Sequence, residues 1–292
     1  MTFTFGSRTA AHSPEPFAPQ QENGPRVHFF AHSKHGVADR HVRVWLPASY
    51  DEDHERRYPV CYLQDGQNVF TPDTAFAGVS WNAHTTAQRL IDEKRIEPVI
   101  LVAVDNSGRH RTDDYTPVPF HGRGGHANDF VRMLIDEIKP FVDAHYRTRP
   151  DRENTAIAGA SLGGLFALHA ALSRPDVFSR AAALSPTVWW GNGELLRRVA
   201  ALRERLPVKL WIDIGKREAP PLRQHVKTLQ ELFVAKGWTK NRITKKATLR
   251  HTEVARGRHD EASWGKRFDR VLKFLFPVPP RRRTKRHRSP NE

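Results

Sequence analysis

Apolar residues in the middle of the chain follow two patterns that alternate along the sequence. Short, nearly unbroken apolar runs end in turn-forming or small residues, at 58–66, 97–108, 155–160, 179–186 and 208–215. Such runs are typical of strands in a parallel sheet that is covered on both faces. Longer segments place apolar residues at helical spacing, at 83–96, 127–146, 162–175, 221–237 and 263–276. The alternation predicts an α/β fold, with a mostly parallel central sheet flanked by helices on both faces.

The two ends of this alternating region add further strands. Segments 27–33 and 41–50 alternate apolar and polar residues and predict two strands joined by a turn around Gly36. Segment 245–254 predicts the last strand. Pro140 lies inside the helical segment 127–146, and we expect it to bend or interrupt that helix.

The composition changes at both ends of the chain. Residues 1–25 are rich in Ser, Pro, Gln and Ala and predict a flexible arm. From residue 277, prolines precede the run RRRTKRHRSPNE, whose six Lys or Arg and one Glu predict a disordered basic tail over 277–292. No repeat or linker interrupts residues 26–276, which we expect to form one domain.

The charge balance of the chain is strongly basic. Its 292 residues include 47 Lys and Arg against 32 Asp and Glu, a net charge of +15. A basic field attracts anions, such as nucleic acid, acidic lipid or an anionic small substrate. The charge alone therefore leaves several classes of partner open.

Cysteine content and hydropathy bear on where the protein works. Cys61 is the single cysteine and lies in an apolar run, so we expect a buried thiol and no intramolecular disulfide. Residues 1–20 contain no apolar stretch of signal-peptide length, and no segment reaches the roughly 18 apolar residues of a membrane helix. We therefore expect a cytoplasmic protein without a membrane span.

Ser161 lies in a glycine-rich junction between a predicted strand and a predicted helix. Residues 159–163 read GASLG and fit the pattern G-x-S-x-G. In α/β hydrolases this pattern forms a tight turn that raises the serine hydroxyl above the sheet edge. We expect a Cβ at position 159 or 163 to collide where the two backbones approach. The pattern and its context predict that Ser161 is a nucleophile.

A serine nucleophile needs a base, and the base needs an orienting acid. In this fold the order along the chain is serine, acid, histidine. His259 lies in ARGRHDEASW, the loop between the last predicted strand and the last helix, and is the predicted base. The other downstream histidines fall in helical segments, a strand or the tail: His169, His225, His251 and His287.

The acid is predicted to follow the strand at 208–215. Glu218 lies in the loop just after Gly215, at the edge where the site must form, and is the preferred residue. Asp213, within the strand, stays an alternative, and Asp260 is a third. The sequence leaves the choice between Glu218 and Asp213 open.

An oxyanion hole in this fold takes two backbone N–H groups. One comes from the residue after the nucleophile, here Leu162. The other comes from the loop after an earlier strand, here LQDGQNVF, in which the N–H of Gln67 is the best candidate and Gly66 provides the turn.

Four segments taken together resemble the putative-esterase family of α/β hydrolases. They are YPVCYLQDGQNVF, GASLGGLFALHAALSRPDVFSRAAALSP, WIDIGKRE and GRHDEASW, and the resemblance runs in order over residues 27–276. The family includes esterase D-type thioesterases, feruloyl and acetylxylan esterases, enterochelin esterases and mycolyltransferases. The chain is most similar to the enterochelin esterase-like members, and we expect it to be without the separate N-terminal domain that many of them carry.

The resemblance implies an α/β-hydrolase fold and a site. Ser161 matches the nucleophile, His259 the base and Glu218 the acid, while Gln67 and Leu162 match the oxyanion donors. It implies hydrolysis of an ester through an acyl-enzyme, without a metal or cofactor. His121 and His126, in HGRGGH, are expected to belong to a flexible loop rather than to a metal site.

Aromatic and basic residues in the loops after the strands are candidates for substrate contacts. The aromatic candidates would suit an aromatic or extended acyl group: Trp81, Tyr115, Trp189 and Trp190. Arg109 and Arg111 could meet an anionic substrate. Siderophore lactones, aryl esters and other acyl esters all stay open as substrates.

Two other functions compete with ester hydrolysis. An acyltransferase on the same fold would pass the acyl group to an alcohol instead of water. An inactive hydrolase fold could bind nucleic acid or another anionic surface through the basic tail. The intact Ser161, Glu218 and His259 argue against the second alternative.

Overall fold

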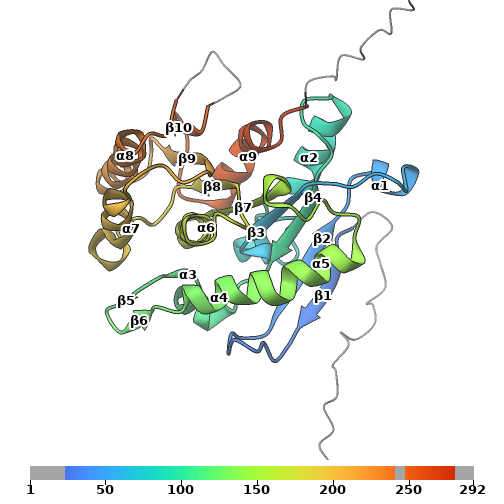
Figure 1. Ribbon diagram of the computed structural model, residues 1–292, viewed down its shortest axis with the longest axis horizontal. Helices are drawn as coiled ribbons and strands as arrows, with labels where there is room; N and C mark the ends of the chain where they lie inside the picture. Colours follow the sequence, from blue (N-terminus) through green and yellow to red (C-terminus); the bar gives the residue numbers. More distant parts are fainter. Residues whose placement is uncertain (1–23, 241–246, 280–292) are drawn as a thin grey trace, which may run out of the picture.

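The computed structural model describes residues 24–240 and 247–279. The predicted N-terminal arm and the basic tail therefore lie almost entirely outside the described residues. Within them, eight strands form one sheet (Figure 1), in the order β1 (Arg26–Phe30), β2 (Arg40–Trp45), β4 (Ile100–Val104), β3 (Val60–Gln64), β7 (Thr155–Ala160), β8 (Arg180–Leu184), β9 (Lys209–Gly215) and β10 (Leu249–Val254).

The sheet is mostly parallel, as predicted. Only β2 runs against its neighbours, because it pairs antiparallel with both β1 and β4. The remaining pairs, from β4 across to β10, are parallel. Every residue of β3, β4 and β7 is buried, which explains why these strands are nearly unbroken apolar runs in the sequence.

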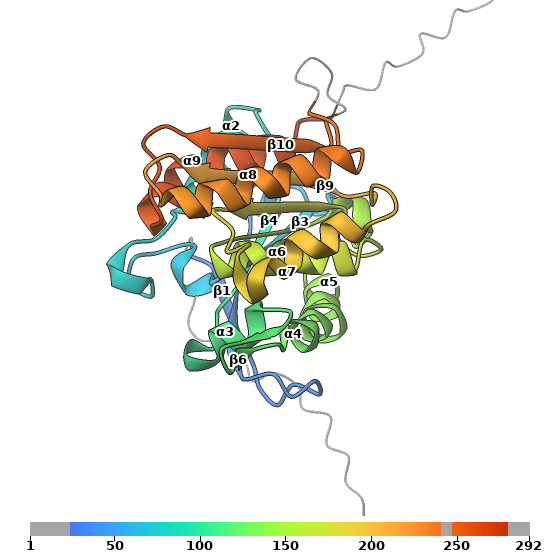
Figure 2. The same ribbon diagram turned by 90° about the vertical axis from the view of Figure 1, so that its left-hand side faces the viewer.

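Helices cover both faces of the sheet, which confirms the predicted layers (Figures 1 and 2). One face carries α2 (Ala83–Asp92) and α9 (Glu261–Leu275). The other carries α4 (Ala127–Met133), α5 (Lys139–His145), α6 (Leu162–Ser173), α7 (Trp190–Ala201) and α8 (Pro220–Ala235).

Short elements lie in the connections. They are the helices α1 (Ser49–Glu52) and α3 (Arg111–Tyr115), the hairpin β5 (Pro119–Phe120) and β6 (Arg123–Gly124), and the single turns η1 (Gly66–Asn68), η2 (Phe76–Gly78), η3 (Gly108–His110) and η5 (Arg152–Asn154).

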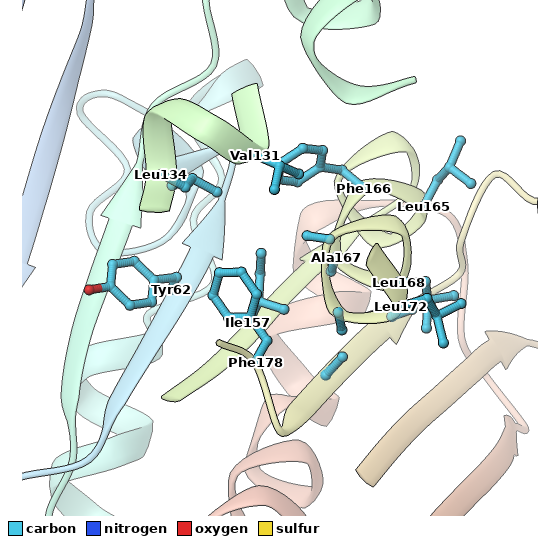
Figure 3. Close-up of a cluster of buried hydrophobic side chains, with 14 of the residues drawn as sticks. Tyr62, Val131, Leu134, Ile157, Leu165, Phe166, Ala167, Leu168, Leu172 and Phe178 are labelled. Carbon is cyan, nitrogen blue, oxygen red and sulfur yellow. The ribbon is translucent and has the colours of Figure 1, made fainter. Parts of the chain in front are cut away.

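The core consists of two apolar clusters, one on each face of the sheet. In the cluster of Figure 3, Phe166 of α6 and Val131 of α4 lie above Ile157 of β7. Fully burying one such side chain contributes about 1.5–3 kcal/mol relative to leaving it exposed. Residues 163–172 of α6 are all buried, so the helix that follows Ser161 is anchored along its length.

Pro140 interrupts its helix, as expected. A π-helical segment, η4 (Leu134–Ile138), separates α4 from α5, and the Lys139 N–H donates to the Leu134 carbonyl five residues back. Pro140 is the second residue of α5, where its missing N–H costs least.

Helix α7 was not predicted from the sequence. Its first turn contains Gly191, Asn192 and Gly193, all with positive φ. These residues favour a turn and obscure the helical spacing of Leu195 and Val199, which are both buried.

Candidate active site

The carboxyl ends of six neighbouring parallel strands, from β4 across to β10, meet at one edge of the sheet. Gln64 pairs with Val104, Ala160 with Leu184, and Gly215 with Val254 at the last paired positions. The loops that follow these residues carry Gln67, Ser161, Glu218 and His259. Ligand sites in open α/β sheets form at this edge.

Ser161 lies in the predicted tight turn between β7 and α6. Its backbone is left-handed (φ 57°, ψ −123°), a strained conformation for a residue with a side chain. Its N–H donates to the Leu184 carbonyl at 3.0 Å, which fixes the turn to β8. A Cβ on Gly159 would lie 2.4 Å from the Gly163 carbonyl oxygen, so the predicted collision is confirmed there.

His259 links the serine to a carboxylate. Its Nε2 lies 2.9 Å from Ser161 Oγ, and its Nδ1 lies 2.8 Å from Glu218 Oε2. An ionised carboxylate only accepts hydrogen bonds, so Nδ1 carries the proton and Nε2 is free to accept from the hydroxyl. The imidazole is about one-third exposed and packs edge-on against Trp264, with ring centroids 5.0 Å apart.

Glu218 is buried and held in the ionised form. Desolvation alone would raise the pKa of its carboxyl, but hydrogen bonds from His259, Ser185 and the Gly215 N–H outweigh burial and lower the pKa. Ser185 Oγ donates to Oε1 at 2.6 Å and the Gly215 N–H at 2.7 Å. The oxygen Oε2 is left to face His259.

The alternative acids have other partners. Asp213 is fully buried and accepts from Trp211 Nε1 at 2.9 Å, and its Oδ1 lies 3.0 Å from a guanidinium nitrogen of Arg267. Asp260 caps helix α9 by accepting from the Ser263 N–H at 2.7 Å. The structure therefore brings Glu218, and neither of these, to His259.

The two residues predicted to form an oxyanion hole lie in the loops at this edge of the sheet. Leu162 is the first residue of α6, and Gln67 lies in turn η1 directly after β3. Neither N–H has a hydrogen-bond partner among the described residues. Gly66 lets this turn pass close to β4, since a Cβ there would lie 2.7 Å from the Ala103 carbonyl carbon.

A charged network holds the turn that carries Gln67. Asp65 has left-handed backbone, and its carboxylate accepts two hydrogen bonds from Arg111, at 2.6 and 2.9 Å. Asn106 donates to the same carboxylate at 2.7 Å and, through its backbone N–H, to Gln67 Oε1 at 3.1 Å. Arg111 is thus paired with Asp65, whereas Arg109 is exposed and donates to His110 Nε2 at 3.0 Å.

The aromatic candidates separate into buried and exposed rings. Trp81 and Tyr115 are 3% and 0% exposed, so their predicted contact with substrate is corrected: both rings pack beneath the loops. Trp190 is also buried, and its Nε1 donates to the Val118 carbonyl at 2.7 Å. Trp189 is 37% exposed and lies two residues after Thr187, whose hydroxyl is 3.3 Å from Ser161 Oγ.

The remaining predicted residues lie apart from the site. Cys61 is buried, and desolvation raises the pKa of its thiol to about 12. His121 and His126 are exposed, and His126 pairs with Asp129. The described residues contain no group of three or more His, Cys, Asp or Glu side chains that could hold a metal ion. Within the described ranges, no helix is both long and apolar enough to cross a membrane.

Sequence reasoning missed Ser185 and Thr187, which contact Glu218 and Ser161 respectively. Both residues lie in the segment SPT, directly after β8. Their place after a predicted parallel strand is the one signal that could have identified them, because such segments meet at the same edge.

Comparison with known proteins gives a family and several relatives. The family model described as Putative esterase matches residues 33–275. YbbA, an uncharacterised protein of Bacillus subtilis, is 22% identical over 259 residues, which cover 84% of this chain and 95% of YbbA. A siderophore enterobactin esterase of Emericella nidulans is 36% identical over 126 residues, 41% of either chain.

Solved structures share the fold. The enterobactin esterase of Shigella flexneri, solved in the presence of enterobactin, superposes with a TM-score of 0.68 at 21% identity. The match covers 87% of this chain but only 59% of that enzyme. This chain therefore corresponds to part of that longer protein.

Proposed function

We propose that this chain, which belongs to the Putative esterase family and is an esterase, hydrolyses carboxylic esters through a covalent acyl-enzyme on Ser161. One observation carries the proposal. Ser161 Oγ, the His259 imidazole and the Glu218 carboxylate form a continuous hydrogen-bonded chain, with links of 2.9 and 2.8 Å, at the carboxyl edge of the sheet. Nucleophile, base and orienting acid in this geometry are what acyl transfer by serine requires.

The first half of the reaction forms the acyl-enzyme. Ser161 Oγ attacks the ester carbonyl carbon while His259 Nε2 takes the hydroxyl proton. The imidazolium that forms is stabilised by the ionised Glu218 at Nδ1. The carbonyl oxygen becomes an oxyanion, and the carbon–oxygen bond to the alcohol then breaks as His259 returns its proton to the leaving alcohol.

The N–H groups of Leu162 and Gln67 would stabilise the oxyanion. Both N–H groups are free of other partners in the described residues. One donor of this kind contributes roughly 10²- to 10³-fold in rate. In the second half, His259 deprotonates a water molecule that attacks the acyl carbon, and Ser161 leaves with the proton.

The substrate class is a small-molecule ester. The names of the relatives favour a siderophore lactone, since the Emericella nidulans and Shigella flexneri proteins are enterobactin esterases. The exposed ring of Trp189, two residues after the Thr187 whose hydroxyl is 3.3 Å from Ser161 Oγ, supports an ester that carries an aromatic group. Cytoplasmic location stays a prediction.

Hydrolysis of p-nitrophenyl acetate and butyrate tests the proposal. We expect the wild-type protein to turn over and both Ser161→Ala and His259→Ala to lose several orders of magnitude in kcat. Equal rates for the three proteins would refute it. Enterobactin and a linear aryl ester, compared by product chromatography with and without added acceptor alcohols, then separate lactone hydrolysis, aryl ester hydrolysis and acyl transfer.

A further inference from the structure

A buried ion pair lies behind Glu218 and takes no direct part in the proposed reaction. Asp213 of β9 is 0% exposed and the side chain of Arg267 of α9 is 2% exposed. Their closest oxygen and nitrogen are 3.0 Å apart, and Trp211 Nε1 donates to the second carboxylate oxygen at 2.9 Å. Burying two charges is costly even when they are paired, and apolar residues of similar size often stabilise a core as well or better.

Ser185 connects this pair to the catalytic carboxylate. Its Oγ accepts from Arg267 Nη2 at 2.5 Å and from Trp264 Nε1 at 3.1 Å, and donates to Glu218 Oε1 at 2.6 Å. A hydroxyl has one proton and two lone pairs. Since both lone pairs are taken, the proton can point only at Glu218.

The backbone of Ser185 is also constrained. Its φ of 45° lies in the left-handed region, which is unusual for a residue with a side chain. Its N–H donates to the carbonyl of Asp213 at 2.9 Å. The strand that carries the buried carboxylate therefore also fixes the residue that orients Glu218.

One guanidinium nitrogen faces two carboxylates. Arg267 Nη2 is 3.0 Å from Asp213 Oδ1 and 3.9 Å from Glu218 Oε1. The nearer carboxylate is not the catalytic one. If Asp213 were uncharged, the positive charge of Arg267 would act on Glu218 and, beyond it, on His259, where a like charge opposes formation of the imidazolium.

The charged and titratable groups of this cluster come from four segments of the chain in and around β9 and α9. Asp213 comes from β9, Glu218 from the loop after it, Arg267 from α9, and His259 from the loop that precedes α9. Desolvation raises the pKa of Asp213 to about 6, and Arg267 opposes this rise. The Asp213 carboxylate is thus mostly ionised at pH 7 and above, where it can neutralise Arg267.

We propose that Asp213, Arg267 and Ser185 are positioning residues for the catalytic carboxylate. Asp213 neutralises Arg267, and Ser185 carries a hydrogen bond from that pair to Glu218, so that Glu218 faces His259 with its full charge. The proposal deepens the proposed function and rests on it, because these residues act on the reaction only through Glu218 and His259.

Asp213→Asn tests the charge with little change of shape. We expect kcat for p-nitrophenyl butyrate to fall about tenfold at little change in KM, because the uncompensated guanidinium opposes the positive charge that forms on His259 in the transition state. The acid limb of kcat/KM and the His259 midpoint in an NMR titration should both move to lower pH. Asp176→Asn, which removes an exposed surface carboxylate paired with Arg174, is the matched control and should change neither.

Two further variants separate electrostatics from folding. Ser185→Ala removes one oxygen and no charge, and leaves Arg267 to pair directly with Glu218, so His259 should again titrate at lower pH. In the double variant Asp213→Asn with Arg267→Gln, no uncompensated charge remains and the His259 midpoint should return to its wild-type value.

The outcomes distinguish this inference from the proposed function. If Asp213→Asn or Ser185→Ala folds, as judged by circular dichroism, and His259 titrates as in the wild type, the inference is wrong. If Ser161→Ala hydrolyses the ester at the wild-type rate, the proposed function fails. The His259 titration is measured without substrate and decides the electrostatic coupling in either case.

Discussion

Replacing Glu218 by Gln changes one oxygen of the buried carboxylate to an amide NH₂, and the structure predicts which one. Oε1 accepts from Ser185 Oγ and from the Gly215 N–H, whereas Oε2 faces His259 Nδ1. The amide oxygen must take the position where two donors meet, so the NH₂ group faces the imidazole. His259 can then accept only at Nδ1, which places its proton on Nε2, toward Ser161.

In that tautomer His259 cannot take the hydroxyl proton. We therefore expect kcat to fall by about 10³- to 10⁴-fold with little change in KM, because the lost interaction acts in the transition state. Stability should also change with pH. The lowered pKa of Glu218 contributes stability above its unfolded pKa of 4.5, and this is lost as the pH falls through the lower folded pKa. The Gln variant should lack this loss.

Steady-state hydrolysis of p-nitrophenyl butyrate at pH 7.5 measures kcat and KM for Glu218→Gln beside Asp213→Asn. The second variant should lose only about tenfold, since Asp213 has no contact with His259. The reverse order of the two losses would make Asp213 the acid. A Gln variant that keeps a tenth of the wild-type kcat would show that the tautomer argument is mistaken.

Three other substitutions test the framework around the site. Gly159→Ala places a Cβ 2.4 Å from the Gly163 carbonyl oxygen and should cost about 1–3 kcal/mol, read as a lower Tm, together with a lower kcat. Arg111→Lys cannot keep both hydrogen bonds to Asp65 and should lower kcat more than it changes KM; an unchanged kcat would mean that this pair does not hold the turn. Burial lowers the pKa of His169 to about 3 in the folded protein. As the pH falls below 6.5, His169 therefore takes up a proton in the unfolded chain but not in the folded protein. The free energy of unfolding should fall by about 1.4 kcal/mol per pH unit between about pH 6.5 and 3. Urea unfolding of His169→Gln should show a shallower decline over this range.

The strands of the sheet and the tight turn at Ser161 could be predicted from the sequence because both depend on local residues. The central strands are apolar apart from end residues such as Gln64 and Thr155, and the Ser161 turn needs only small residues between a strand and a helix. The acid could not be chosen in this way, because Asp213 and Glu218 belong to the same strand and the loop after it. A long-range contact decides it. A Cβ on Gly215 would lie 2.3 Å from the Gly257 carbonyl, and this close approach brings the loop of His259 beside Glu218.

Side-chain direction is what the pattern of residues could not give. Trp81 and Tyr115 lie in connections after strands, as substrate-binding aromatics would, yet both rings face inward. Trp81 is held by Glu261, 180 residues further along the chain, and the hydroxyl of Tyr115 accepts from the Asp65 N–H. Such partners are close only after folding, so their effect cannot be read from local composition.

Three neighbouring strands end in the same way, and this explains how the site is held. β3, β7 and β8 are each followed directly by a residue with a side chain and a left-handed backbone: Asp65 (φ 57°), Ser161 (φ 57°) and Ser185 (φ 45°). Each such residue costs of order 1–3 kcal/mol and persists only where the surroundings fix it. Here the fixing contacts are Arg111 on the first, β8 on the second and β9 on the third. The strain therefore lies along one edge of the sheet, at the turn that carries Gln67, at Ser161 and at the residue that contacts Glu218. The three turns come from separate loops, but they lie side by side because they follow the carboxyl ends of neighbouring parallel strands.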